Sequence, residues 1–334
     1  MVRLQSQRMS RPRGNRRKTY LTYLHCDFFS LLSLTVSNVA SFRLPDPAGR
    51  AGGALTSALL NTTYADHKDT GKDLTFKETL FAVRDSLKAK GYEQIPQLSS
   101  SRPTDMDEHF TIVPSDFTGK RRAVMIGINY VGDNPGELHG CHNDVLNMRE
   151  YIKKCHGFTD QDIVLLLDDG KHTPPTSANI MAAFKKLASE AQPGDACFVH
   201  YSGHGCSIRD DDGDEADGKD EALCPVDYAK AGVLRDDDVL EVLIAPLAKG
   251  VTLTCIMDCC HSGSILDLPY IFLGDGMQQE MVADPNFDFA PLIQMVNTFA
   301  KMGFEGLKKL HEKGKVRRKK EREWIKNRLA AYLK

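Results

Sequence analysis

The sequence lacks a strong excess of either charge, an apolar run long enough to cross a membrane, and a regular cysteine spacing. Its 43 basic and 45 acidic residues give a formal net charge of -2, which argues against a general nucleic-acid binder. No run approaches the roughly 18 apolar residues of a membrane span. The 9 cysteines show no disulfide framework, which favours free thiols in a reducing, cytoplasmic location. What is left is an ordinary globular chain, long enough to bury a sizeable core.

Both ends of the chain are basic, and each allows two interpretations. Residues 1–26 hold basic side chains and no acidic one, and an apolar run follows. They fit either a targeting segment or a solvated arm that leads into a strand. Residues 303–334 hold many more basic than acidic side chains. A solvated charged helix is the first interpretation of this tail, and a patch for nuclear import or for an anionic surface is the second.

The middle of the chain predicts an α/β fold. Thr75 and Glu78 form a capping-box pattern before an amphipathic helix that ends at Gly91. From residue 122, apolar strand patterns alternate with helical ones, which indicates βαβ units, a mostly parallel sheet and helices on both faces. The four predicted strands are 123–128, 163–167, 197–201 and 251–257.

Two of these strands end in motifs that can carry chemistry. His204 follows the third strand in a glycine-rich turn, and Cys259 and Cys260 follow the fourth. Because the carboxyl ends of parallel strands meet at one edge of a sheet, we expect the histidine and a cysteine to lie side by side there. A thiol needs a neighbouring base to act as a nucleophile at neutral pH. The pattern therefore predicts cysteine-nucleophile hydrolysis, with either cysteine as the nucleophile.

An acidic stretch follows the histidine motif. Residues 210–221 are mostly aspartate and glutamate, and three further aspartates occupy 236–238. Carboxylate oxygens are the ligands that hard cations prefer, but the spacing does not fit an EF-hand loop. From the residues alone, a cation site and a solvated acidic loop are both open.

Several motifs, in order, closely resemble the metacaspases. They are 122–130 (RAVMIGINY), 140–145 (GCHNDV), 200–205 (HYSGHG), 214–221 (DEADGKDE), 225–228 (PVDY), 258–263 (DCCHSG) and 266–270 (LDLPY). The stretches 46–53, 56–60 and 91–98 resemble the small-subunit region of the same family. That region precedes the catalytic one here, which resembles the type III arrangement. The resemblance divides the chain into a basic N-terminal segment (1–36), a small-subunit-like region (37–103), a linker (104–121), a catalytic region (122–272) and a C-terminal extension (273–334).

The resemblance implies a caspase–haemoglobinase-like three-layer α/β/α fold. It also implies a monomeric, calcium-dependent endopeptidase that cleaves protein substrates after Arg or Lys and is linked to stress or cell death. Neither a nucleic-acid partner nor a membrane partner is expected. Carried over by position, the site residues are the base His204, the nucleophile Cys260, the substrate-binding Asp144, Ser202 and Asp258, and the calcium ligands Asp220, Asp236, Asp237 and Asp267.

Two further points go beyond the family pattern. Residues 23–36 occupy the place of a family strand without resembling it, so an altered strand is expected there. Cys206 and Cys255 lie near the ends of neighbouring predicted strands, which suggests a redox pair beside the site. A non-proteolytic, calcium-responsive binding protein on the same fold is the alternative function.

Overall fold

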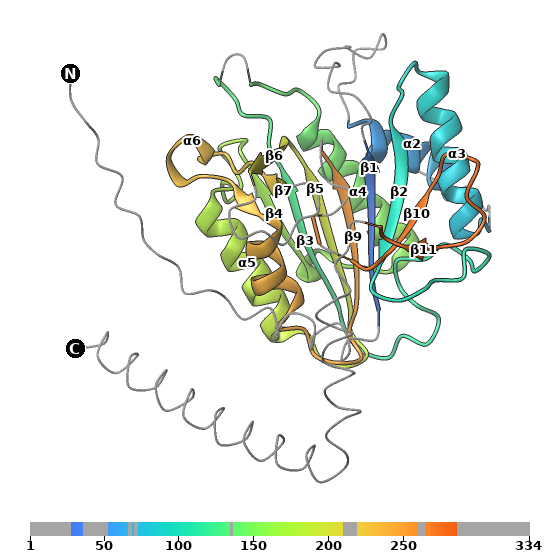
Figure 1. The fold of residues 1–334 in the computed structure, drawn as a ribbon. Helices are drawn as coiled ribbons and strands as arrows, with labels where there is room; N and C mark the ends of the chain where they lie inside the picture. The colour runs from blue at the N-terminus through green and yellow to red at the C-terminus, as the bar shows by residue number, and fades with distance from the viewer. Residues whose placement is uncertain are drawn as a thin grey trace, which may run out of the picture. The chain divides into compact units, whose positions relative to one another are not determined.

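The computed structural model describes residues 28–35, 53–65, 69, 73–133, 136–209, 219–259, 265–266 and 268–285 (Figure 1). For 28–35 it describes the course of the backbone. By its internal contacts the chain divides into residues 1–287 and residues 288–334, and the second unit lies outside the described residues. The predicted basic tail falls there. Within the described ranges, no helix is long and apolar enough to cross a membrane.

A large sheet runs through the first unit in the strand order β11–β10–β2–β1–β9–β5–β3–β4. Its five consecutive strands from β1 to β4 are parallel, and β2 and β11 run antiparallel to their neighbours. The bounds are β1 (Phe28–Thr35), β2 (Ile95–Ser100), β3 (Arg121–Gly127), β4 (Ile163–Leu167), β5 (Ala196–Ser202), β9 (Thr252–Asp258), β10 (Tyr270–Leu273) and β11 (Val282–Ala283). The central strands are buried on both faces, as their continuous apolar runs predict.

Helices cover both faces of this sheet (Figure 1). On one face α2 (Ala54–Thr63), α3 (Phe76–Ala89) and α4 (Cys141–His156) close one apolar core. On the other face α5 (Ser177–Glu190), α7 (Asp236–Val239) and the π-helical turn η3 (Leu240–Ile244) close a second. Alternate residues of β3 serve the two cores, Val124 in one and Met125 in the other, because strand side chains alternate between faces. The predicted three-layer α/β/α fold is confirmed.

A smaller antiparallel sheet follows the carboxyl end of β5. It contains β6 (Gly205–Arg209), β7 (Lys219–Leu223) and β8 (Leu234–Arg235) in that order. The short helices α6 (Tyr228–Ala231) and η2 (Asp160–Asp162) complete the described elements. The chain thus returns through this small sheet to the region of His204 before it enters β9.

The local signals in the sequence mark real boundaries. Thr75 accepts a hydrogen bond from the amide of Glu78, and the Glu78 side chain accepts one from the amide of Thr75, so the capping box is confirmed. Gly91 has a φ of 80°, the left-handed conformation that suits the end of a helix.

The N-terminal strand lies in the middle of the sheet. β1 pairs in parallel with β9 and antiparallel with β2. The segment that departs from the family pattern therefore still supplies a central strand, directly beside the strand that leads to Cys260. Ser99 and Ser100, near the end of the small-subunit-like region, are buried at the end of β2.

Candidate active site

The two motif-bearing strands are aligned so that their ends coincide. β5 and β9 are neighbours, and Ser202 pairs with Asp258 in the register. His204 and Cys260 each follow two residues after this pair. Cys260 itself lies outside the described residues. The paired residues from which the chain leads to His204 and to Cys260 nevertheless lie side by side at the carboxyl edge of the sheet.

His204 is fixed from two sides. Its backbone N–H donates to the Tyr130 hydroxyl at 2.9 Å, and its Nε2 lies 2.7 Å from the carbonyl oxygen of Gly136. The imidazole ring also packs against the Tyr130 ring, with centroids 4.7 Å apart. Because a carbonyl oxygen can only accept, Nε2 must carry the hydrogen. In the neutral ring this leaves Nδ1 in the basic form, the form that can take a proton from a thiol.

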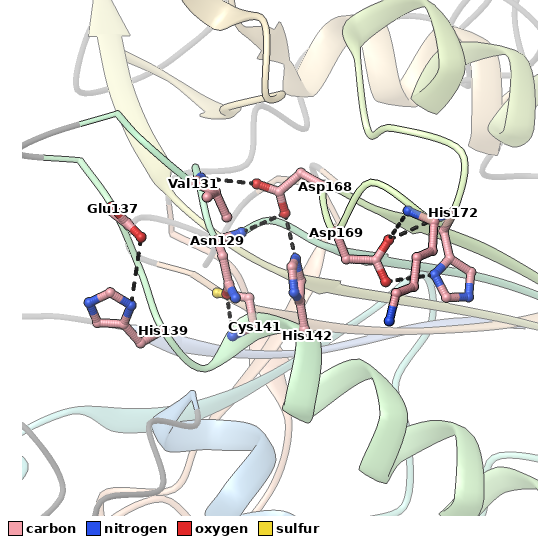
Figure 2. A network of polar contacts seen from close by, with 10 residues as sticks. Asn129, Val131, Glu137, His139, Cys141, His142, Asp168, Asp169 and His172 are labelled. Carbon is pink, nitrogen blue, oxygen red and sulfur yellow. Dashed lines mark hydrogen bonds and ion pairs between the residues drawn. The ribbon is translucent and has the colours of Figure 1, made fainter.

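The loop that carries Tyr130 and Gly136 is held by Asp168 at the end of β4. Figure 2 shows the Asp168 carboxylate facing the loop and the imidazole of His142. It accepts from the amide of Asn129 at 2.9 Å and contacts Nε2 of His142 at 2.5 Å. The Asn129 side chain in turn accepts from the amide of Cys141 at 3.0 Å. These bonds tie the start of the loop to the start of α4.

Tyr130 has a backbone conformation that L-residues rarely adopt. Its φ is 53°, although it is not a glycine, and its side chain is buried. Its hydroxyl donates to the carbonyl oxygen of Cys224 at 2.6 Å while accepting from His204. Such strain persists only where the surroundings enforce it, and here the hydrogen bonds do so. Gly203 permits this arrangement, since a Cβ there would lie 2.9 Å from the Tyr201 hydroxyl and 3.1 Å from that of Tyr130.

A buried acidic pair lies beside the paired strand ends. Asp144 of α4 accepts from the Ser202 hydroxyl at 2.7 Å. Burial, together with the neighbouring Asp258 carboxylate, raises the pKa of Asp144 to about 8. Burial also raises the pKa of Asp258. The structure thus brings the three predicted substrate-binding residues together. Without a neighbouring cation, ionisation of both carboxylates in this buried place costs free energy.

The first turn of α2 contacts both carboxylates. The Gly53 amide donates to Asp144 at 2.6 Å, and the Thr56 amide donates to Asp258 at 2.7 Å. A Cβ at Gly53 would lie 2.0 Å from an Asp258 oxygen, so only glycine lets the helix approach this closely. Neither this contact nor the contacts of Tyr130 are predicted from the sequence. The one signal there is that Gly53 and Tyr130 lie within stretches that resemble the family.

Three of the four predicted calcium ligands, Asp220, Asp236 and Asp237, lie in or directly after strands of the small sheet. Asp220 is buried and forms an ion pair with Arg235, and Asp236 accepts from the amides of Glu221 and Asp237. Burial, with further repulsion from Asp220 and Glu221, raises the pKa of Asp236 to about 8. A divalent cation would relieve this repulsion, and carboxylates are suitable donors for it. Within the described ranges no three such side chains form a metal-holding group, and Asp267 lies outside them.

The structure gives Cys206 a different neighbour from the predicted one. Its sulfur lies 3.6 Å from that of Cys224, where β6 faces the end of β7. Cys255 is fully buried in the middle of β9, and all three thiols are free. The hydrogen bond from Cys224 lowers the pKa of Cys206 to about 7. The sulfur beside Cys206 is therefore that of Cys224 and not that of Cys255. The pairing of β6 with β7 brings Cys206 and Cys224 together.

We expect hydrogen peroxide to join Cys206 to Cys224. The Cys206 thiolate reduces the peroxide to water and becomes a sulfenic acid, and the Cys224 thiol then displaces a second water to form the disulfide. Peptide mass spectrometry should find the two peptides linked with the loss of two hydrogens. Cys224→Ala should abolish the link and Cys255→Ala should preserve it. A link between Cys206 and Cys255 would contradict the expectation.

Comparison with known proteins identifies the family. The metacaspase, peptidase C14 domain matches residues 121–269. The chain is 56% identical over 262 residues to metacaspase III c of Phaeodactylum tricornutum, and the match covers 78% of each chain. It is 51% identical over 165 residues to metacaspase-1A of Aspergillus clavatus, which covers 49% of this chain and 38% of the fungal protein. The chain thus spans less than half the length of this fungal relative.

A solved structure, protein GSU0716 of Geobacter sulfurreducens, is 30% identical over 45% of this chain and 53% of its own, with a TM-score of 0.33. The match to the diatom protein covers most of both chains, and the family domain spans the strands that end at Ser202 and Asp258. This protein belongs to the metacaspases and is a cysteine-type endopeptidase.

Proposed function

We propose that this metacaspase cleaves protein substrates after Arg or Lys, with Cys260 as nucleophile and His204 as base, and that calcium activates it. The proposed specificity rests on one observation, the buried carboxylates of Asp144 and Asp258. Ser202 links them, because its hydroxyl donates to Asp144 and its backbone pairs with Asp258. Family membership supports the chemistry, and the position of the acidic pair supports the substrate class.

In the proposed mechanism, Nδ1 of His204 takes the proton of the Cys260 thiol. The thiolate attacks the scissile carbonyl carbon, and the imidazolium then protonates the leaving amine, so that an acyl-enzyme remains. A water molecule, deprotonated by the same imidazole, releases the acid and restores the thiol. The hydrogen bond from Nε2 to Gly136 supports this cycle, because it fixes the tautomer and steadies the imidazolium.

The acidic pair selects for a basic side chain. A guanidinium or ammonium group supplies the positive charge that two buried carboxylates lack, and it pairs with them in a largely desolvated place. An acidic side chain there would add a further negative charge to the pair, and an apolar one would supply no counter-charge. Arginine has the further advantage that its planar fork can bind carboxylates in a bidentate manner.

Calcium is proposed to bind at Asp220, Asp236, Asp237 and Asp267. When bound, it would neutralise the acidic cluster and so hold the small sheet in one arrangement. The support is the donor chemistry and the raised pKa of Asp236, which burial causes in the first place and repulsion from Asp220 and Glu221 increases. The small sheet also carries Cys224, whose carbonyl oxygen binds Tyr130. A cation that fixes the small sheet would thus also fix Tyr130, whose hydroxyl accepts from the His204 amide.

The remaining parts of the proposal concern the setting of the enzyme. We place it in the cytoplasm as a monomer that acts in stress or cell death. The free thiols of the described cysteines support a reducing location.

The proposed activity is tested with paired fluorogenic peptides that end in Arg or in Asp. We expect cleavage of the Arg peptide with millimolar calcium, little cleavage with chelator, and none of the Asp peptide. Cys260→Ala should abolish the signal without changing the circular dichroism spectrum, whereas Cys259→Ala should retain it. Preference for the Asp peptide, or calcium-independent activity of the folded protein, would contradict the proposal.

Binding of Arg substrates should strengthen as the pH rises. In the empty site the pKa of Asp144 is raised to about 8, so the carboxyl is mostly neutral below that pH and charged above it. An arginine that displaces this proton should therefore show a KM that falls with rising pH up to about 8. Initial rates from about pH 6 to 9 at constant calcium measure this dependence. Asp144→Asn should weaken binding at every pH and flatten the profile; a flat profile in the unaltered enzyme would refute the shared proton.

Tyr130→Phe tests how His204 is positioned. The change keeps the ring contact but removes the hydroxyl that binds the His204 amide and the Cys224 carbonyl. We expect kcat to fall about tenfold while KM stays nearly constant, in line with the loss of buried hydrogen bonds. The matched control is Tyr228→Phe, because the Tyr228 hydroxyl binds Asp133 of the same loop at 2.8 Å but not His204. Equal kcat values for the two variants would remove the assigned role.

A further inference from the structure

A buried histidine that the mechanism does not use lies behind the acidic pair. His200 of β5 is completely buried, and its Nε2 lies 3.1 Å from the Thr56 hydroxyl of α2. Its Nδ1 is buried and has no hydrogen-bond partner among the described residues. Burial lowers the pKa of His200 to about 3, so the ring is neutral at working pH.

The contacts determine which nitrogen carries the hydrogen. A buried N–H without an acceptor is costly, and a buried ring nitrogen without a donor costs less. The hydrogen therefore resides on Nε2, which donates it to the Thr56 oxygen. The Thr56 hydroxyl then has its own hydrogen free to donate elsewhere.

That hydrogen is directed at a carboxylate of the acidic pair. The Thr56 hydroxyl and the Thr56 amide both hydrogen-bond Asp258, the amide at 2.7 Å. A chain of donors therefore runs from His200 through Thr56 to Asp258. In a buried place, such directed donors stabilise the ionised carboxylate and fix its orientation.

We propose that Thr56, oriented by His200, is a specificity-determining positioning residue that keeps Asp258 ionised and directed toward the basic side chain of the substrate. The proposal rests on the assignment of Asp144 and Asp258 as the site for Arg or Lys. Thr56 acts through Asp258 and need not touch the substrate. Among the residues that the structure describes, the titratable groups near Asp258 include Asp144 and Cys141 on α4 and, on the far side of Thr56, His200 on β5.

This role accounts for the close approach of α2 to the site. Gly53 and Thr56 lie one helical turn apart, and their amides bind Asp144 and Asp258 respectively. Both residues belong to the small-subunit-like region, whereas the carboxylates belong to the catalytic region. The pocket for the basic side chain is therefore completed by a helix from outside the family's matched domain.

The experiment compares three variants of the full chain. Thr56→Val keeps the side-chain shape and the backbone amide but removes the hydroxyl, and Thr56→Ser keeps the hydroxyl. Thr63→Val is the matched control, because this threonine lies on the same helix and its hydroxyl binds Leu59 and Tyr151 rather than the acidic pair. KM and kcat for the Arg peptide are measured as a function of pH, and thermal melting monitors folding.

We expect Thr56→Val to raise KM about tenfold with little change in kcat, because Asp258 loses a charge-assisted hydrogen bond. The hydroxyl lowers the pKa of Asp258, so its loss should move the acid side of the kcat/KM profile to higher pH. Thr56→Ser and Thr63→Val should behave like the unaltered enzyme. If Thr56→Val melts below the assay temperature, Thr56→Ala is measured instead and carries the same expectation.

The outcomes distinguish the proposed role of Thr56 from the proposed specificity for Arg or Lys, on which it rests. If the unaltered enzyme cleaves Arg peptides and Thr56→Val has the KM and pH profile of Thr63→Val, the role of Thr56 is refuted while the specificity stands. A fall in kcat alone would likewise refute it, because it would indicate a structural effect on the catalytic groups. Failure of the unaltered enzyme to cleave Arg peptides would refute the specificity itself, and this proposal with it.

Discussion

The parallel register of β3, β5 and β9 is the constraint on which the site depends. Gly127, Ser202 and Asp258 lie in one row across these strands, at their carboxyl ends. From this row β3 continues into the loop that holds His204, β5 into His204 itself, and β9 toward Cys260. A slip of one residue between β5 and β9 would turn the side chains of one strand to the opposite face. The apolar side chains buried on both faces oppose such a slip, so the cores that stabilise the fold also align the site.

The acidic pair imposes the second constraint. Two buried carboxylates repel each other and lose hydration, so a fold that contains them must compensate elsewhere. Here the compensation comes from directed donors: the Ser202 hydroxyl and the Gly53 amide on Asp144, and the amide and hydroxyl of Thr56 on Asp258. The raised pKa of Asp144 shows that this compensation is incomplete. A positive charge beside the pair would offset the remaining cost, and this is the physical basis of the proposed preference for Arg or Lys.

The sequence predicts those parts of the fold and site that depend on neighbours along the chain. The capping box at Thr75, the four strands predicted from 123 to 257 and the place of His204 just after a strand end follow from local patterns. The contact between Cys206 and Cys224 does not, since it arises from the pairing of β6 with β7. The approach of α2 to the acidic pair is similar, because nothing near Gly53 in the sequence indicates that a carboxylate 91 residues away will accept its amide. The periodicity of apolar residues predicts buried strands and capped helices, but it does not predict which polar groups pair over a long distance in the sequence.

The N-terminal region is structurally part of the catalytic unit. β1 lies between β9 and β2, so it is hydrogen-bonded to the strand that precedes Cys260, the proposed nucleophile. α2 contacts α3, α4 and β9, and its first turn donates to the acidic pair. The region that comes first along the chain thus supplies a strand of the central sheet and a helix that contacts the acidic pair. The β1 segment keeps this backbone pairing although its sequence departs from the family pattern.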